Sequence, residues 1–174
     1  MERQLGTTLE EINPSHVHRY RFAASRLNNR HIVDAACGCG YGSKILYDAG
    51  NRVVGVDIDA GAIEHARRYF PNPEYHCADL NVDNFKGDTL VSFETIEHLD
   101  RFDYLKKPCF KMLFASVPNE QHYPFVTEKF KDDNYPHLRH YSPSEFDDFL
   151  NECGWTVEER FCQQNKWSDL EPGV

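Results

Sequence analysis

Short apolar runs alternate along the chain with longer stretches in which apolar residues recur every three or four positions. The first apolar run covers residues 31–36, and a valine-rich run covers residues 52–57, with turn residues next to both. Runs of this kind are typical of buried strands. Further strands are predicted at residues 74–79, 88–94, 110–117 and 155–161.

Four segments between and around these strands have helical periodicity. The clearest covers residues 142–154, where Ser142 and Glu145 form a capping box, Pro143 occupies the first helical position and Gly154 ends the helix. Further helices are predicted after Pro14, from the glycine-rich loop to Gly50, and from Asp59 to Pro71. Strands that alternate with helices indicate an α/β fold, in which helices cover both faces of a parallel sheet.

The length of 174 residues suits a single domain, with a leading helix region at residues 1–29 and a core at residues 30–174. The net charge of −9 repels phosphate backbones and so counts against a general nucleic-acid binder. The six cysteines form no Cys-x-x-Cys pair, and no run of 18 apolar residues or apolar leader is present. We therefore expect a cytoplasmic protein with reduced thiols and no membrane-spanning segment.

Polar and glycine residues gather where the predicted strands end. The loop after the first strand has the spacing G-x-G-x-G, not the G-x-G-x-x-G of dinucleotide-binding proteins. Its glycines are Gly38, Gly40 and Gly42. Acidic residues precede this loop and end the next two strands: Asp34, Asp57 and Asp79. In a parallel sheet these ends share one edge, where ligands bind, and a carboxylate there can accept hydrogen bonds from ribose hydroxyls.

In these motifs the sequence resembles the class I S-adenosylmethionine-dependent methyltransferases, over nearly its whole length. The segments that carry the resemblance are VDAACGCGYGS, VVGVDID, CADL, VSFETIEHL and ASVPN. The resemblance implies a Rossmann-like, doubly wound, mostly parallel sheet of six or seven strands, with S-adenosyl-L-methionine as the cofactor. It also implies the cofactor-binding residues: Asp34, Ala36, Gly38 and Gly40 around the methionine part, Asp57 and Ile58 at the ribose and adenine, Asp79 and Leu80 at the adenine edge, and Phe93 beside the transferable methyl.

Four features depart from the usual pattern of that family. Ala36 stands where glycine is commoner, the segment from Leu80 to Asp88 is shorter than usual, and the segment KKPCFKM lacks the usual proline-glycine-glycine turn. The C-terminus also leaves little room for a seventh strand. We therefore expect a compact version of the fold that is trimmed at the C-terminal edge of its sheet.

The segment FETIEH supplies the candidate catalytic residues Glu94, Glu97 and His98. The small-RNA 3′-terminal 2′-O-methyltransferases have a similar stretch, which binds a divalent metal together with a distant histidine. By that resemblance Glu94, Glu97, His98 and His137 would hold Mg or Mn, and His140 is the alternative to His137. Two other interpretations stay open: His98 as a metal-free general base, and a purely structural role for the segment.

The sequence therefore predicts a methyltransferase that transfers a methyl group to an oxygen or nitrogen atom of a small-molecule acceptor. An RNA 3′ end is an alternative acceptor, disfavoured by the net charge. A second alternative is a protein that binds the cofactor and transfers nothing. The sequence is compatible with a monomer or a homodimer, since an incomplete sheet edge invites pairing.

Overall fold

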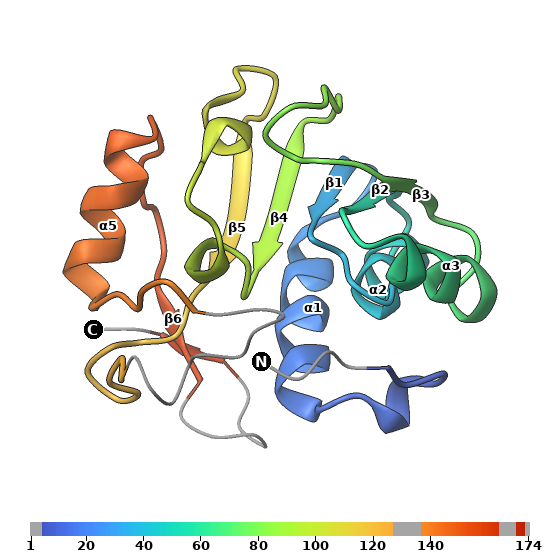
Figure 1. Ribbon diagram of the computed structural model, residues 1–174, viewed down its shortest axis with the longest axis horizontal. Helices are drawn as coiled ribbons and strands as arrows, with labels where there is room; N and C mark the ends of the chain where they lie inside the picture. The colour runs from blue at the N-terminus through green and yellow to red at the C-terminus, as the bar shows by residue number, and fades with distance from the viewer. Residues whose placement is uncertain (1–4, 127–136, 164–169, 173–174) are drawn as a thin grey trace.

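The structure, a computed structural model, describes residues 5–126, 137–163 and 170–172. Its centre is one sheet of five parallel strands (Figure 1). These strands are β1 (His31–Ala35), β2 (Arg52–Asp57), β3 (Glu74–Cys77), β4 (Thr89–Phe93) and β5 (Met112–Ser116). All five lie inside ranges predicted from the sequence.

The strand order is β3-β2-β1-β4-β5, so the order reverses between β1 and β4. The central strand β1 pairs with β2 from His31 opposite Arg52 and with β4 from Ile32 opposite Thr89. Because every pair is parallel, all the carboxyl ends meet at one edge of the sheet.

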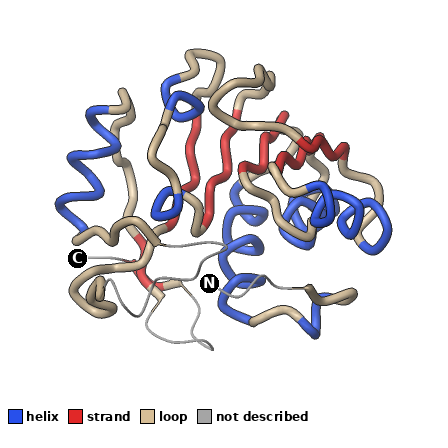
Figure 2. Tube along the Cα trace, in the orientation of Figure 1, coloured by secondary structure: helices blue, strands red, loops and turns tan. Residues whose placement is uncertain are grey.

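Alternate residues of the strands enter two separate cores. Ile32 and Val91 pack with α1 (Pro14–Arg26) and α2 (Tyr41–Asp48) on one face. Their neighbours Val33 and Leu90 pack with α5 (Pro143–Glu152) on the other face. The tube view shows α5 well apart from the other long helices (Figure 2). This period of two is what a strand buried on both faces requires.

The helices begin and end close to the predicted signals. The side chain of Asp59 caps α3 (Ala60–Tyr69) by accepting a hydrogen bond from the Ala62 amide at 2.8 Å. Ser142 and Glu145 form the predicted capping box of α5. The described residues also contain three short 3-10 turns: η1 (Leu9–Glu11), η2 (Ile96–His98) and η3 (Asp103–Lys106).

The C-terminal edge differs from the expected six or seven strands. Within the described residues the main sheet ends at β5, while β6 (Phe161–Cys162) and β7 (Glu171–Pro172) form a separate antiparallel pair. Most of the predicted strand at 155–161 therefore joins no ladder. The alternation of apolar and polar residues in this segment reflects side-chain burial and not strand pairing. Trp155 packs into the same core as α5, and its indole N–H donates to the Leu105 carbonyl at 2.8 Å.

Candidate functional site

A cavity of about 240 Å³ lies at the carboxyl edge of the sheet. The chain enters it just after β1, at the end of β2, just after β3 and at the end of β4. The cavity is therefore at the point where the strand order reverses, where ligands bind in such sheets. Its lining residues include the predicted Ala36, Gly38, Asp57, Ile58, Asp79, Leu80, Phe93, Glu94 and His98.

The three glycines of the loop have different roles. Gly38 lines the cavity with φ of +54°, and a Cβ there would meet no atom within 4 Å. Gly40 has φ of +86° and lies so close to α3 that a Cβ would be 2.5 Å from the Ala66 Cβ. Gly42 packs against the Tyr20 ring, and a Cβ added at Gly42 would lie only 2.1 Å from the nearest carbon of that ring. Only Gly38 of the three therefore exposes backbone to a ligand, while the other two permit close packing.

Asp57, at the end of β2, organises the loop backbone. Its carboxylate accepts hydrogen bonds from the Gly38 amide and from the Asp59 amide, each at 2.9 Å. A carboxylate offers about four lone-pair sites, so two are left for a ligand in the cavity. Asp57 thus connects the second strand to the glycine loop and presents an acceptor between them.

Asp34 is fully buried below the loop and does not line the cavity. The Tyr20 hydroxyl donates to its Oδ1 at 2.9 Å, and the Ser43 hydroxyl donates to its Oδ2 at 2.6 Å. Burial raises the pKa of Asp34 to about 7, although both hydroxyls favour the ionised form. This carboxyl group therefore ties α1 and α2 to β1.

Two lining residues have a left-handed backbone without being glycine. Ala36, just after β1, has φ of +53°, and Glu94, just after β4, has φ of +50°. This conformation is costly for a residue with a Cβ and concentrates at binding and catalytic sites. In both places the chain turns sharply at the mouth of the cavity.

Glu94 is held by polar groups from two other elements. Its Oε1 accepts from the Ser116 hydroxyl at 2.7 Å and lies 3.7 Å from the Arg19 guanidinium of α1. Burial opposes ionisation of Glu94, but Arg19 and Ser116 overcome it and lower the pKa of this carboxyl group. Beside it, burial and the charge of Arg19 lower the pKa of His16 to about 4, and its Nδ1 lies 3.1 Å from the Tyr41 hydroxyl.

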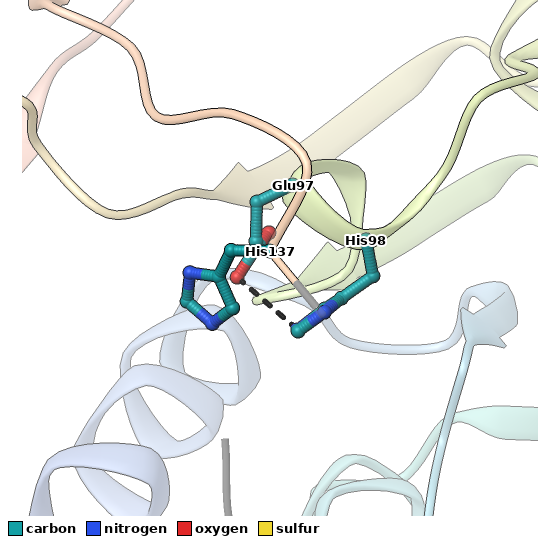
Figure 3. A group of neighbouring side chains, drawn as sticks. All are labelled: Glu97, His98 and His137. Atoms are coloured by element: carbon teal, nitrogen blue, oxygen red, sulfur yellow. Dashed lines mark ion pairs between the residues drawn. The ribbon is translucent and has the colours of Figure 1, made fainter. Parts of the chain in front are cut away.

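Glu97, His98 and His137 form a cluster next to the cavity (Figure 3). One ligand atom from each lies within 4.8 Å of the others. Glu97 and His98 come from η2, and a hydrogen bond of 2.7 Å from the Leu138 amide to the Glu97 carbonyl brings His137 beside them. Three of the four predicted metal-binding residues thus converge, while Glu94 bonds to Ser116 and Arg19.

The chemistry of Glu97 fits a cation. Its side chain is completely buried, and neither carboxyl oxygen has a hydrogen-bond partner among the described residues. Burial and the nearby charge of Glu94 raise the pKa of Glu97 well above its usual range. A divalent metal held by one carboxylate and two imidazoles would offset that burial, because its charge favours the ionised carboxylate. The cluster could therefore hold such an ion through Glu97, His98 and His137.

Some predicted residues lie outside the cavity lining, and several residues within the lining were not predicted from the sequence. Asp34, Gly40, Glu97 and His137 are outside the lining. His16, Tyr41, Asn81 and Thr95 line the cavity without having been predicted. His16 comes from a helix that carries no motif, so only packing could reveal it, whereas Tyr41 lies within the quoted segment VDAACGCGYGS and could have been named from it. Asn81 and Thr95 directly follow predicted site residues, a proximity that could have indicated them.

Comparison with known proteins finds a family match over part of the chain and similar sequences among described proteins. Residues 32–114 match the family described as "Methyltransferase domain". A protein of Mycolicibacterium smegmatis described as a "Probable S-adenosylmethionine-dependent methyltransferase/" is 29% identical over 150 residues, which are 80% of this chain and 57% of the relative. The chain thus spans little more than half the length of that relative.

Two solved structures share the fold. Magnesium protoporphyrin IX methyltransferase from Synechocystis PCC 6803 with bound SAH superposes with a TM-score of 0.67 at 17% identity, covering 92% of this chain and 83% of that one. The methyltransferase domain of bacterial CtHen1-C gives a TM-score of 0.64 at 16% identity, covering 87% and 88%. The chain is thus similar to S-adenosylmethionine-dependent methyltransferases in sequence, and it shares the fold of these two methyltransferase structures. None of its described helices has the length and apolar character needed to cross a membrane.

Proposed function

We propose that the protein binds S-adenosyl-L-methionine in the cavity and transfers its methyl group to an oxygen or nitrogen atom of a small-molecule acceptor. The observation that carries this proposal is the continuity of the cavity. One cavity is lined both by Gly38, Asp57 and Leu80 and by Glu94 and His98. Cofactor-binding groups and candidate catalytic groups therefore share a single space.

The lining residues that we propose for cofactor binding suit a nucleoside. Asp57 has acceptor capacity left for two ribose hydroxyls after its two backbone hydrogen bonds. Ile58 is 70% exposed at the cavity and, with Leu80, offers apolar surface to a purine ring. The backbone of Gly38 can approach the methionine part because no side chain covers it.

The candidate catalytic residues favour oxygen as the acceptor atom. When bound, the cofactor supplies a methyl group on a sulfonium, which leaves the protein to align the acceptor and take its proton. With the cofactor bound, His98, which lines the cavity, would take the proton that the acceptor hydroxyl releases when it is methylated. In the alternative arrangement Glu97, His98 and His137 would hold a divalent metal, which would lower the pKa of an adjacent hydroxyl, and His98 would then be a metal ligand and not the base.

Calorimetric titration with S-adenosyl-L-methionine tests the cofactor site. We expect Asp57→Ala to raise the dissociation constant at least about 30-fold, because two charge-assisted hydrogen bonds and the loop anchor are lost. Asp48→Ala is the matched control, since Asp48 pairs with Lys44 on the outer surface of α2 and is absent from the cavity lining. Equal affinity in the wild type and Asp57→Ala would remove this site from the proposal.

Methyl transfer is then followed with methyl-labelled cofactor and a panel of small phenols and sugars. We expect labelled product that His98→Ala reduces about 100-fold or more, the range for loss of a general base. Cofactor binding with no transfer to any acceptor would favour the non-catalytic alternative.

The cluster also favours a second candidate function, metal-dependent methylation of an RNA 3′-terminal ribose. The observation behind it is the convergence of Glu97, His98 and His137, while the net charge of −9 counts against a polyanionic acceptor. This candidate predicts that a chelator and His137→Ala each abolish transfer to a 3′-terminal ribose. Transfer to a small phenol or sugar that a chelator leaves unchanged would exclude it.

A further inference from the structure

A chain of hydrogen bonds lies behind the Glu97–His98–His137 cluster. His137 Nδ1 is 2.7 Å from His140 Nε2, and His140 Nδ1 is 2.7 Å from the Tyr123 carbonyl oxygen. The His140 side chain is completely buried, and the Tyr123 ring stacks on it with an angle of 17° between the planes. None of the proposed chemistry requires His140 to contact a ligand, and it is absent from the cavity lining.

The direction of these hydrogen bonds follows from their end point. A carbonyl oxygen only accepts, so His140 Nδ1 must carry a hydrogen. The Glu120 carboxylate, 3.7 Å from this nitrogen, is an acceptor as well. In the neutral ring His140 Nε2 is then an acceptor, and it takes the hydrogen of His137 Nδ1.

The same direction decides the tautomer of His137. With its hydrogen on Nδ1, the neutral His137 ring has its lone pair on Nε2. The two imidazoles of His137 and His98 meet edge to face at 88° with centroids 4.6 Å apart, beside the Glu97 carboxylate (Figure 3). A metal ligand needs that lone pair.

Backbone hydrogen bonds fix the position of His137 and His140 relative to the Glu97–His98–His137 cluster. Residues Asn119 and Tyr141 form a parallel bridge, and the Glu120 amide donates to the Tyr141 carbonyl at 2.8 Å. The Tyr123 amide in turn donates to the Asn119 carbonyl at 2.8 Å. The segment that carries His137 and His140 is thus tied to the chain after β5 on one side and to η2 on the other.

We propose that His140 is a positioning residue that sets the tautomer of His137, and so prepares the Glu97–His98–His137 cluster to bind a divalent metal. The inference rests on the metal site of the proposed function and deepens it. His140 itself contacts neither the metal nor the acceptor. Because its Nδ1 donates to the Tyr123 carbonyl, its Nε2 is left to accept the hydrogen on His137 Nδ1.

Two substitutions separate this hydrogen-bonding role from simple packing. His140→Phe keeps an aromatic ring and removes both nitrogens. His140→Gln restores one donor and one acceptor on a single amide, able to face Tyr123 and His137. The control is His65→Ala, because His65 also binds a backbone carbonyl, that of Gly6 at 3.0 Å, and lies away from the cluster on α3.

The experiment is a calorimetric titration of each folded variant with Mn²⁺ alone. We expect His140→Phe to raise the dissociation constant 10- to 100-fold, the usual cost of losing a group that orients a ligating histidine, and His140→Gln to stay within about 3-fold of the wild type. His65→Ala should bind as the wild type does. Equal affinity in His140→Phe, or a loss in His140→Gln as large as in His140→Phe, overturns the inference while leaving the metal site standing.

A second measurement requires no metal. The nitrogen chemical shifts of the His137 ring report which nitrogen carries the hydrogen, and we expect Nδ1–H in the wild type and in His140→Gln but not as the single form in His140→Phe. Wild-type His137 with its hydrogen on Nε2 overturns the inference. If the wild type binds no Mn²⁺, the metal site and the inference both fall, and cofactor titration of the same sample shows whether the methyltransferase proposal stands.

Discussion

Two completely buried carboxyl groups, Asp34 in β1 and Glu97 in η2, are treated in opposite ways by their surroundings. Asp34 receives hydrogen bonds from the hydroxyls of Tyr20 and Ser43. Glu97 receives none within the described residues. Burial raises the pKa of both groups, yet only Asp34 accepts hydrogen bonds from other side chains of the protein. A buried polar atom without a hydrogen-bond partner is rare in folded proteins, so Glu97, whose Oε1 lies 3.8 Å from His98 Nε2, is the carboxyl group whose surroundings best suit a cation.

At the residue scale we predict a pH-dependent difference in stability between the wild type and Asp34→Asn. The folded pKa of Asp34, about 7, lies above the usual value of 3.8. Its contribution to the free energy of unfolding is therefore complete below about pH 4, falls as the pH rises to about 7 and is then constant. The whole change is on the order of 4 kcal/mol, since each pKa unit corresponds to about 1.4 kcal/mol.

Asparagine removes this titration while the two hydroxyls can turn to serve the amide. Denaturant unfolding of both proteins between pH 4 and pH 8, without cofactor, measures the difference. A wild-type-minus-variant difference that does not change across this range would contradict the prediction.

At the element scale, contact between helices explains much of the glycine loop. Gly42 lies in the first turn of α2 and lets the Tyr20 ring of α1 pack directly on the helix backbone. Gly40 does the same for α3 against α2. The spacing of these glycines therefore serves the helices as much as the ligand, which is why the three glycines could not be distinguished by spacing alone.

We predict that Gly42→Ala lowers the free energy of unfolding by about 1–3 kcal/mol, because the new methyl group would overlap the Tyr20 ring. The matched control is Gly61→Ala in α3, where the added Cβ lies 3.2 Å from one Asp59 side-chain oxygen and the site is exposed. This control should be neutral or stabilising by up to about 1 kcal/mol, since alanine favours a helix. Equal effects of the two substitutions would contradict the packing role of Gly42.

At the scale of the whole molecule, the cavity joins parts that lie far apart in the sequence. Its lining comes from α1, from the loops after β1 and β3 and from the ends of β2 and β4. A ligand that binds there contacts most of the sheet's carboxyl edge. It should therefore stabilise the folded molecule as a unit.

We predict that S-adenosyl-L-methionine at 100 times its dissociation constant stabilises the wild type by about 2.7 kcal/mol. For a chain of this size the melting temperature should rise by roughly 5–10 °C. Asp57→Ala should show almost none of this rise, whereas Asp48→Ala should show all of it. A thermal melt followed by circular dichroism measures the shift, and a full rise in Asp57→Ala would count against the proposed position of the ribose.

The sequence by itself determined the elements and their order. Strands β1 to β5 and helices α1, α2, α3 and α5 follow from periodicity and capping residues, because these signals depend on neighbours two to four positions apart. It also placed Asp57, Ile58, Asp79 and Leu80 at strand ends that share one edge, since parallel strands leave no other arrangement.

Only the tertiary structure decided which residues meet across long separations. A backbone hydrogen bond between positions 97 and 138 brings His137 to Glu97, and packing against Tyr20 and Ala66 gives Gly42 and Gly40 their roles. Within the described residues the sheet ends at β5. The alternating segment 155–161 buries Trp155 in the core and does not pair with β5. Local patterns record how a segment is buried, whereas its partners are chosen by the packing of the whole chain.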